Sequence, residues 1–499
     1  MLLILILSTI FATALAYQWR NRQKLPKGPI PLPVIGNFHQ FLYYGFKFGN
    51  AVSVFHHFEK IYGKVFTIWM GPLPTVYISD YEVANETHIK RAHQFSKRFT
   101  TGTLNYIREG RGIITSNGDF WQDHRRFALQ TLRGFGLGRN IMEDKVMEEF
   151  RYRINDYNKT HSKNGAIEIH TGTFFDLLVG SIINQLLIGE RFEQNDKEFE
   201  KLKNSLASAL ENFSMVDIFF PTWFLNSPLM RWRQKKVFEP FDYILEMTNK
   251  NINERVNAIE KGDHVIEGNG EDFLDAYLVK IEKDEREGVQ STFNLTTLSI
   301  DISDLWQAGQ ETTSTTMTWA CACFLNNPRI VPRVREELWK VTAGNRSLSL
   351  CDRPDTPFFN ATLHEVQRFA SIFNFNLFRH IEEDTVVAGQ PLAAGTALTT
   401  QLCMLHTDEK LFKKPNEFRP ERFIEDATLE KKLIPFGIGK RACPGESLAR
   451  AELYLILGNL IMEYEIKPCG PIPPVRTIAP FGLLNRPPHF NVRFEPVKV

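Results

Sequence analysis

The sequence predicts a mainly α-helical protein with a small β-sheet region, built as one large domain behind an amino-terminal membrane anchor. Apolar residues recur at helical spacing over long stretches, for instance from residue 148 to 157 and from 446 to 464. Two β-branched runs, 65–68 and 74–78, are separated by a Gly-Pro turn and indicate short strands. The first 16 residues carry no charge, which is typical of a membrane segment.

Composition narrows the class of protein. The chain has 499 residues, of which 43% are hydrophobic and 23% charged, so it can bury a large core and is not a disordered, collagenous or coiled-coil protein. The formal net charge is +1, without the basic excess of a general nucleic-acid binder, so no nucleic-acid partner is expected. Six cysteines are too few for a secreted disulfide scaffold, which favours a reducing compartment.

Residues 1–19 are predicted to form a single transmembrane anchor. Nineteen helical residues span roughly 28 Å, close to the hydrocarbon thickness of a bilayer. Tyr17 and Trp19 form an aromatic edge, and basic residues follow only on the carboxyl side, which keeps the body cytoplasmic. The alternative is a cleaved signal peptide ending at 14–16, but no basic residue precedes the apolar run.

Residues 20–36 are predicted to be a basic, proline-rich linker, and 37–499 the folded domain. Alternating prolines favour an extended polyproline II strap, which would set the orientation of the body against the membrane or serve as an ordinary linker. The apolar, Pro-broken segment 218–225 is either core or an exposed patch that touches lipid. Residues 261–290 are charged and are expected to form a solvated excursion.

The loop around Cys443 is the part of the sequence that indicates a functional site most strongly. Gly437 and Gly439 permit positive φ, and Pro444 suits the first position of the helix that follows. Cys443 would then lie at a helix amino terminus, where the thiolate is favoured, and Arg441 adds a cation nearby. No second Cys or His has the spacing of a zinc site, and a single thiolate suits haem iron better.

The loop from Phe436 to Gly445 matches F-x-x-G-x-R-x-C-x-G, and here the sequence resembles the cytochrome P-450 haem-thiolate superfamily. The resemblance implies the cytochrome P-450 fold for the domain at 37–499. It implies that Cys443 is the axial ligand of haem b (iron protoporphyrin IX), that Phe436 packs beside its sulfur, and that Arg441 belongs to the cofactor-binding residues.

A second candidate site, from residue 304 to 313, lies in a helical stretch that ends at residues 326–328. Glycine and threonine are poor helix formers, and the hydroxyls can bond to the carbonyl four residues earlier and bend the helix. Alone this would be a tolerated polar patch. The segment from Ala308 to Thr313 is, however, similar to the superfamily's A-G-x-E-T-T motif. The resemblance implies that Thr312 hydrogen-bonds the O2 co-substrate and that Glu311 relays protons.

Glu365 and Arg368 lie three residues apart on one predicted helix face, which alone indicates a surface ion pair. In the superfamily this E-x-x-R pair meets the arginine of a P-E-R-F element, here Arg422. The resemblance implies a structural role for these three residues in the scaffold of the cysteine loop.

Trp121 and Arg125 share one helix face and match W-x-x-x-R. The resemblance implies that both reach a haem propionate, because an arginine fork suits a carboxylate. Arg98 and Arg379 occupy positions that resemble two further propionate contacts, and both are expected to bind the cofactor.

The sequence is most similar to the microsomal family-two subgroup, which contains drug-, steroid- and fatty-acid-metabolising monooxygenases. Gln307 departs from the small residue usual before Ala-Gly, so the cavity would be smaller and more polar if Gln307 faces the iron. The residues expected to line the substrate pocket are Trp306, Gln307, Ala308, Phe373, Leu377, Leu483 and Leu484.

The resulting hypothesis is a monooxygenase that inserts one oxygen atom of O2 into a hydrophobic small molecule, a xenobiotic, steroid or fatty acid. No Rossmann glycine pattern occurs, so electrons from NADPH must come through a partner. By resemblance this is NADPH–cytochrome P-450 reductase in the endoplasmic reticulum membrane, with cytochrome b5 as a second candidate. A basic docking face would comprise Arg125, Arg126, Arg133, Lys432 and Lys440. Two alternatives stay open: a haem-thiolate isomerase or peroxygenase that needs no external electrons, and a non-catalytic haem sensor or carrier.

Overall fold

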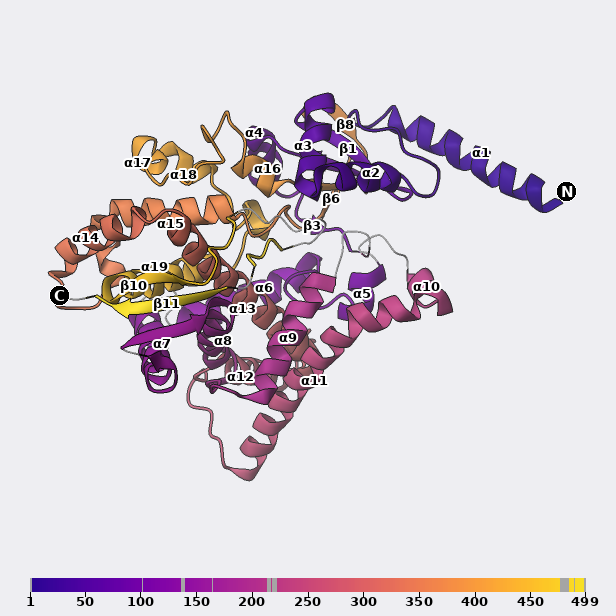
Figure 1. The fold of residues 1–499 in the computed structure, drawn as a ribbon. Coiled ribbons are helices and arrows are strands. Elements are labelled where there is room, and N and C mark those ends of the chain that lie inside the picture. Colours follow the sequence, from indigo (N-terminus) through magenta and orange to yellow (C-terminus); the bar gives the residue numbers. More distant parts are fainter. Residues whose placement is uncertain are drawn as a thin grey trace.

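The computed structural model describes residues 2–100, 102–135, 140–163, 165–212, 217, 222–475, 484–488 and 490–497. Most of this chain is helical, as predicted (Figure 1). The α-helices are α1 (Leu2–Arg22), α2 (Phe38–Phe48), α3 (Ala51–Tyr62), α4 (Tyr81–Asn85), α5 (Gly102–Arg108), α6 (Gly118–Gly134), α7 (Asn140–His161), α8 (Thr171–Ile188), α9 (Lys197–Asn212), α10 (Thr222–Leu225), α11 (Arg231–Lys261), α12 (Phe273–Arg286), α13 (Leu295–Asn326), α14 (Ile330–Thr342), α15 (Pro357–Ala370), α16 (Leu402–His406), α17 (Arg422–Glu425), α18 (Thr428–Lys432) and α19 (Glu446–Glu463).

The strands form small sheets at the edges of the helical mass. They are β1 (Val65–Met70), β2 (Leu73–Ile78), β3 (Lys97–Arg98), β4 (Ser162–Lys163), β5 (Ala166–His170), β6 (Arg379–His380), β7 (Thr385–Val387), β8 (Gln390–Leu392), β9 (Ala397–Thr400), β10 (Tyr464–Cys469) and β11 (Asn491–Pro496). The sheet orders are β1-β2-β9-β6-β3, β10-β11-β5-β4 and β7-β8. The predicted β1–β2 hairpin is present and antiparallel, and β2 pairs with β9 in parallel.

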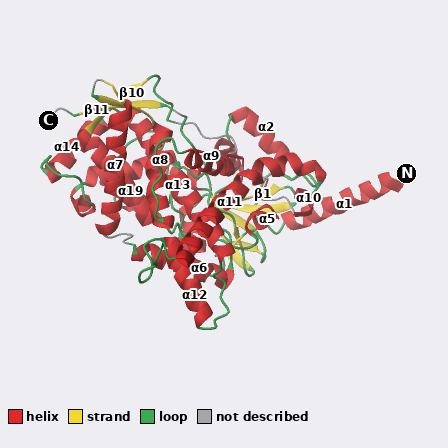
Figure 2. Cartoon of the chain, turned by 90° about the horizontal axis from the view of Figure 1, so that it is seen from below, coloured by secondary structure: helices red, strands yellow, loops and turns green. Residues whose placement is uncertain are grey.

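The long helix α13 lies in the middle of the helical part, beside α8 and α9 (Figure 1, Figure 2). Two glycines allow the close approach to α8. A Cβ on Gly309 would lie 2.7 Å from Ile183 Cδ1, and a Cβ on Gly180 would lie 2.9 Å from the Phe199 ring. Gly309 therefore lowers helix propensity locally but permits packing that no larger residue would allow.

The amino-terminal helix α1 projects away from the body (Figure 1, Figure 2). It continues to Arg22, three residues beyond the predicted anchor. Among the described residues, one helix is long and apolar enough to cross a membrane, α8, but 83% of that stretch is buried inside the protein. Because this apolar stretch is buried on most sides, α8 is a core helix of the domain.

The proline-rich segment after α1 is packed rather than free. The Thr67 amide of β1 donates to the Lys27 carbonyl at 3.2 Å, and the Asn37 amide donates to the Trp69 carbonyl at 2.8 Å. A side chain at Gly28 would collide with the Thr67 carbonyl oxygen, at 1.8 Å. The strap therefore fixes the exit of α1 relative to the first sheet.

Two sequence expectations need correction. The segment 261–290 is not only a solvated excursion, because it contains α12, which buries Phe273 and Tyr277 against the core. Asp275 and Asp284 of α12 are buried and pair with Arg255 and Lys280, and its exposed charges lie near the carboxyl-terminal end. The high charge content of the segment therefore concealed a helix that packs on the core. The expectation for 218–225 concerns residues of which 218–221 lie outside the described part of the chain, whereas Leu225 is buried.

Candidate active site

The cysteine loop is held by its own backbone and by glycines. The Cys443 amide donates to the Phe436 carbonyl at 2.9 Å, which closes the loop. Gly437 and Gly439 have φ of 69° and 78°, as the sequence predicts. A Cβ on Gly439 would lie 1.9 Å from the His88 carbonyl oxygen, so glycine is required there for space as well as for conformation.

Helix α19 begins at Glu446 with Gly445 as its N-cap, so Pro444 precedes the helix and does not occupy its first position. The Cys443 side chain is reached by solvent, although most of its surroundings are protein. This burial raises the pKa of the thiol, while the Gly445 amide and Arg125 act in the opposite direction. The helix terminus therefore does not outweigh the effect of burial on the pKa of this thiol, whereas a metal cation at the sulfur would favour the thiolate.

A cluster of four arginines, of which Arg125 is half-buried and the other three are buried, lies beside the loop. Arg98 and Arg379 are paired on strands β3 and β6. Arg125 of α6 donates to the Ala442 carbonyl at 2.6 Å, directly before the cysteine. The Arg441 guanidinium lies over the Trp121 ring, 3.6 Å from its centre. The structure thus brings together the predicted cofactor-binding residues Arg98, Trp121, Arg125, Arg379 and Arg441.

These arginines repel one another. Burial lowers the pKa of Arg379, and the charges of Arg98, Arg441 and Arg125 lower it further. In the described part of the chain none of the four forms an ion pair with a carboxylate, and Trp121 Nε1, Arg379 Nε and Nη2, and Arg441 Nη1 have no hydrogen-bond partner. Buried donors of this kind require an acceptor. A group that carries two carboxylates, such as the two haem propionates, fits the cluster in charge and in hydrogen bonding.

Helix α13 presents a small hydroxyl-bearing face. Ala308 is exposed and Thr312 is half-buried, although both lie in the middle of a core helix. The Thr312 hydroxyl donates to the Ala308 carbonyl at 2.7 Å, the bond to the fourth residue back that the sequence suggests. Thr313, the next residue, donates to the buried carboxyl of Glu452 and so ties α13 to α19.

Glu311 does not share the face of Thr312. Its side chain is 3% exposed, and its Oε2 forms an ion pair with Arg486 Nη2. Burial raises the pKa of the Glu311 carboxyl to about 7, although Arg486 opposes the shift. Arg486 stands without helical or motif context in the sequence, which explains why no pattern identified it as a partner.

The structure contradicts the prediction that Trp306 lines the pocket. The side chain is fully buried, and its indole Nε1 donates to Asn184 Oδ1 of α8 at 3.0 Å. Residues two positions apart on a helix point about 200° apart, so Trp306 faces away from the side that exposes Ala308.

Gln307 belongs to a buried polar group that includes an arginine the sequence reasoning missed. Arg108 of α5 forms an ion pair with Asp304 at 2.7 Å, and its Nη2 donates to Gln307 Oε1 at 3.4 Å. Asp304 also accepts from the Ile114 amide at 3.0 Å. The Gln307 side chain is therefore turned toward α5. The polar group expected at this position is present, and it is hydrogen-bonded to Arg108.

The other predicted pocket residues divide into two groups. Phe373 and Leu484 lie side by side through a backbone bridge, which joins the segment after α15 to the carboxyl-terminal segment. Leu377 is half-buried next to the strand that carries Arg379. Leu483 lies outside the described residues.

The predicted scaffold pair forms a buried triad. Arg368 Nε and Nη2 donate to the two oxygens of Glu365, each at 2.8 Å, and Arg422 Nε donates to Glu365 Oε2 at 3.1 Å. Remaining guanidinium donors reach backbone carbonyls, including those of His406 and Pro415. The triad therefore connects α15 to α17 and to the irregular segments that precede the cysteine loop.

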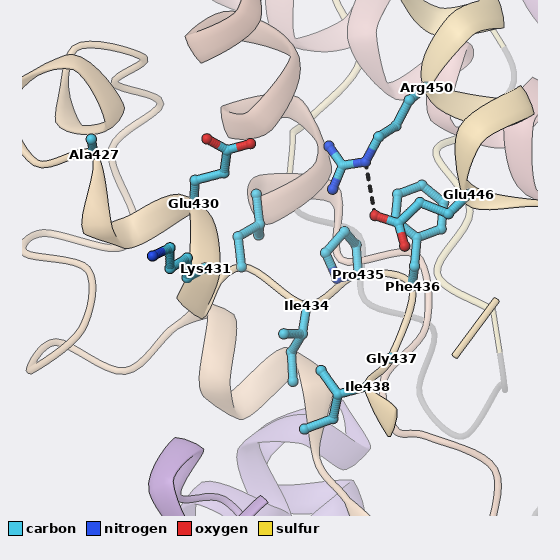
Figure 3. Close-up of a pocket in the computed structure, with 11 residues that line it drawn as sticks. Ala427, Glu430, Lys431, Ile434, Pro435, Phe436, Gly437, Ile438, Glu446 and Arg450 are labelled. Carbon is cyan, nitrogen blue, oxygen red and sulfur yellow. Dashed lines mark hydrogen bonds and ion pairs between the residues drawn. The ribbon is translucent and has the colours of Figure 1, made fainter. Parts of the chain in front are cut away.

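Phe436 lies on the outer side of the loop beside a surface pocket of about 430 Å³ (Figure 3). Its ring is 5.1 Å from the Arg450 guanidinium, and Arg450 pairs with Glu446 across the rim. Apolar side chains form much of the wall, from Leu433 to Ile438, and Glu430 and Lys431 stand opposite the ion pair (Figure 3). Cys443 does not line this pocket.

Comparisons with known proteins decide the family. The cytochrome P450 family model matches residues 26–494. The chain belongs to the cytochrome P450 family. It is 36% identical over 491 residues to probable cytochrome P450 cyp-35D1 of Caenorhabditis elegans, covering 98% of each chain. It is 33% identical to cytochrome P450 2C6 of Rattus norvegicus, covering 100% of this chain and 99% of the relative, and 32% identical to cytochrome P450 2C8 of Homo sapiens, covering 99% of each.

Membership confirms the predicted enzyme class, a P450 monooxygenase, and its cofactor, haem held by a cysteine thiolate, with O2 as co-substrate. The buried donors of the arginine cluster and the solvent-reached thiol of Cys443 fit this cofactor. This chain also carries two arginines that the motifs do not reveal, Arg108 and Arg486, each paired with an acidic residue of α13.

Proposed function

We propose that this P450 is a membrane-anchored monooxygenase that hydroxylates hydrophobic small molecules, such as xenobiotics, steroids or fatty acids, with electrons that a reductase takes from NADPH. The observation that carries the proposal is the arginine cluster beside Cys443, whose unpaired buried donors suit the propionates of haem. When bound, the haem supplies the chemistry that activates O2 and inserts one of its oxygen atoms into a C–H bond.

The chain's own residues would hold the haem from two sides. Cys443 would bind the iron through its sulfur, and Gly437 and Gly439 keep the loop close enough to the body for that contact. Arg98, Arg125 and Arg379 would donate to the propionates, which would relieve their mutual repulsion. Arg441 is already bonded to the Ser96 and Ser116 carbonyls and would complete the cluster from the loop side.

Thr312 and Glu311 would deliver protons to the reaction site. The Thr312 hydroxyl, anchored to Ala308, would be placed to hydrogen-bond O2, while the buried Glu311 carboxyl takes up and releases a proton near neutral pH. The apolar pair Phe373 and Leu484 would exclude water and hold the substrate. The buried Arg108–Asp304 pair would fix the position of Gln307 on the α5 side of α13.

The electron donor would dock near the cysteine loop. Arg126, Arg133 and Lys440 are exposed, whereas Arg125 and Lys432 are half-buried. Arg125 is engaged with the Ala442 carbonyl, so it would serve the cofactor more than the docking face. NADPH–cytochrome P-450 reductase is the proposed partner and cytochrome b5 a second candidate, because acidic surfaces complement exposed basic side chains.

The membrane disposition is supported by two groups of exposed apolar side chains. Trp19 is on α1, and Phe46, 95% exposed, is on α2 with Leu42 and Tyr43. Leu229 and Trp232 follow α10 and are also exposed. Helices α1, α2 and α10 lie on the same side of the molecule in both views (Figure 1, Figure 2). This face would rest in the endoplasmic reticulum membrane, with α1 as the single-pass anchor.

Reconstitution in liposomes with the reductase, NADPH and O2 tests the function. A panel of steroids, fatty acids and drug-like amines should yield a product that contains one atom of isotopically labelled O2. Turnover without reductase and NADPH would instead support an isomerase or peroxygenase. Ligand-induced spectral changes without any product would support a haem sensor or carrier.

A further inference from the structure

Arg486 connects the buried Glu311 of α13 to the surface. Its Nη2 contacts Glu311 Oε2, and its Nη1 lies 2.7 Å from Glu211 Oε1 on α9. The Glu311 side chain is almost fully buried, whereas that of Glu211 is 59% exposed. One arginine therefore spans the distance between the interior carboxyl and solvent.

The position of Arg486 is fixed by the residue before it. Asn485 Nδ2 donates to the Ala370 carbonyl at 2.8 Å, its amide donates to the Ile372 carbonyl, and its own carbonyl accepts from Trp319 Nε1 at 3.0 Å. These bonds attach the segment to α15 and to α13, two turns of helix beyond Glu311. Arg486 is thus held where it meets Glu311.

Other charged groups surround the pair. Asp176 of α8 and Lys203 of α9 form an ion pair at 2.9 Å. Burial raises the pKa of Glu311 to about 7; Asp176 and Glu211 act in the same direction, and Arg486 and Lys203 act against it. Around neutral pH this carboxyl therefore exchanges its proton, and the charges on α8, α9 and the carboxyl-terminal segment set the balance.

The two oxygens of Glu311 are in different situations. Oε2 is held by Arg486, whereas Oε1 has no hydrogen-bond partner among the described residues. A carboxylate arranged in this way can stay bound to the arginine through one oxygen while the other accepts a proton.

We propose that Arg486 is a positioning residue for proton delivery: with Glu211 it holds Glu311 through Oε2 and sets the proton affinity of the carboxylate, while Oε1 receives protons that enter from the surface at α9. The inference rests on the proposed function, in which Glu311 serves Thr312. A proton from solvent is added to the Glu311 carboxylate, and the same proton leaves it through water toward the face of α13 that carries the Thr312 hydroxyl, so the carboxylate is regenerated. Each turnover takes two such protons, together with O2 and two electrons from the reductase, and releases water and the hydroxylated substrate.

The test is an infrared pH titration of the resting, haem-loaded protein, which needs no turnover. The band of the protonated Glu311 carboxyl is identified by its loss in Glu311→Gln. Arg486→Met removes a cation and should raise the midpoint of this band by about 1 pH unit or more. Glu211→Gln removes an anion and frees Arg486 for Glu311, so it should lower the midpoint by a smaller amount. Arg486→Lys should restore most of the shift, and Glu200→Gln, an exposed change on the same helix, should leave the midpoint in place.

The ratio of product formed to NADPH consumed should follow the same shifts along the pH axis. Midpoints that are unchanged in Arg486→Met and in Glu211→Gln would overturn the inference, while a ratio that still falls in Glu311→Gln would leave the proposed function standing. If Arg486→Met does not fold, Glu211→Gln decides alone, because it keeps the Arg486–Glu311 pair. If the wild-type protein forms no product, the proposed function fails, whereas the infrared shifts still report whether Arg486 controls Glu311.

Discussion

Arg98 and Arg379 lie directly opposite each other on the antiparallel strands β3 and β6, and both side chains are buried. Like charges opposite each other destabilise a pair of strands. Neither arginine has a carboxylate partner in the described part of the chain, and the charges of Arg98, Arg441 and Arg125 add to burial in lowering the pKa of Arg379. A bound anion would therefore stabilise the cluster, and the two carboxylates of the haem propionates are the anions that we propose for it.

Replacing Arg379 with Met should have opposite effects on the haem-free and haem-loaded proteins. The haem-free protein should gain thermal stability because a repulsive buried charge is removed. The loaded protein should release haem faster, by about tenfold or more, because a charge-assisted hydrogen bond contributes roughly 1.5–3 kcal/mol. Transfer of haem to excess apomyoglobin measures the second effect. A loss of stability in both states would indicate a packing role only.

Replacing Glu365 with Ala should be among the most damaging single changes in the chain. It leaves two buried guanidinium groups, those of Arg368 and Arg422, without their carboxylate, which costs about 3–5 kcal/mol. The matched control is Glu282→Ala, which breaks the exposed pair with Arg286 and should cost less than about 1 kcal/mol. Urea denaturation midpoints measure both variants, and similar midpoints would argue against a buried structural triad.

Replacing Gly309 with Ala should force α13 away from α8. The new Cβ would meet Ile183 Cδ1 at 2.7 Å and Cγ1 at 3.0 Å, and overpacking of this kind costs about 1–3 kcal/mol. The double variant Gly309→Ala with Ile183→Val removes the nearest methyl and should recover much of the loss. Gly134→Ala, where no atom lies within 4 Å of the new Cβ, is the control and should not destabilise the protein. A single variant as stable as the wild type would show that the helices are not in tight contact there.

Glu452 predicts a pH-dependent stability. Burial raises the pKa of its carboxyl from 4.5 to about 8, so the folded protein holds this proton more tightly than the unfolded chain. Its contribution to stability is fully present below pH 4.5 and is lost as the pH rises toward 8. The neutral variant Glu452→Gln lacks this dependence. The free energy of unfolding of the variant minus that of the wild type should therefore increase between pH 5 and 8, by a few kcal/mol at most. A constant difference across this range would contradict the prediction.

Much of the site could be predicted because its residues lie in short motifs. The cysteine loop carries its glycines within ten residues, and the phases of Trp121 and Arg125 or of Glu365 and Arg368 follow from helical spacing. Within each of these motifs, the relative positions of the residues depend mainly on helix or loop geometry over a few residues.

The parts that could not be predicted depend on distant contacts. Arg486 meets Glu311 across 175 positions of chain, and Arg108 meets Asp304 across 196, so no local pattern marks either pair. The neighbours of Trp306 in the motif predict a place in the pocket, but the rotation of α13 points its indole at Asn184. The burial of α12 does not follow from its composition, because two of its acidic residues, Asp275 and Asp284, are themselves buried and are neutralised by Arg255 and Lys280.

Binding of the haem iron by the sulfur of Cys443 is tested most directly by the spectrum of the reduced protein with carbon monoxide. The wild-type protein should show the strongly red-shifted Soret band of a thiolate-ligated haem. Cys443→Ser should lose this band while it still binds haem through the arginine cluster. A wild-type spectrum without the shift, or a serine variant that keeps it, would contradict the assignment of Cys443.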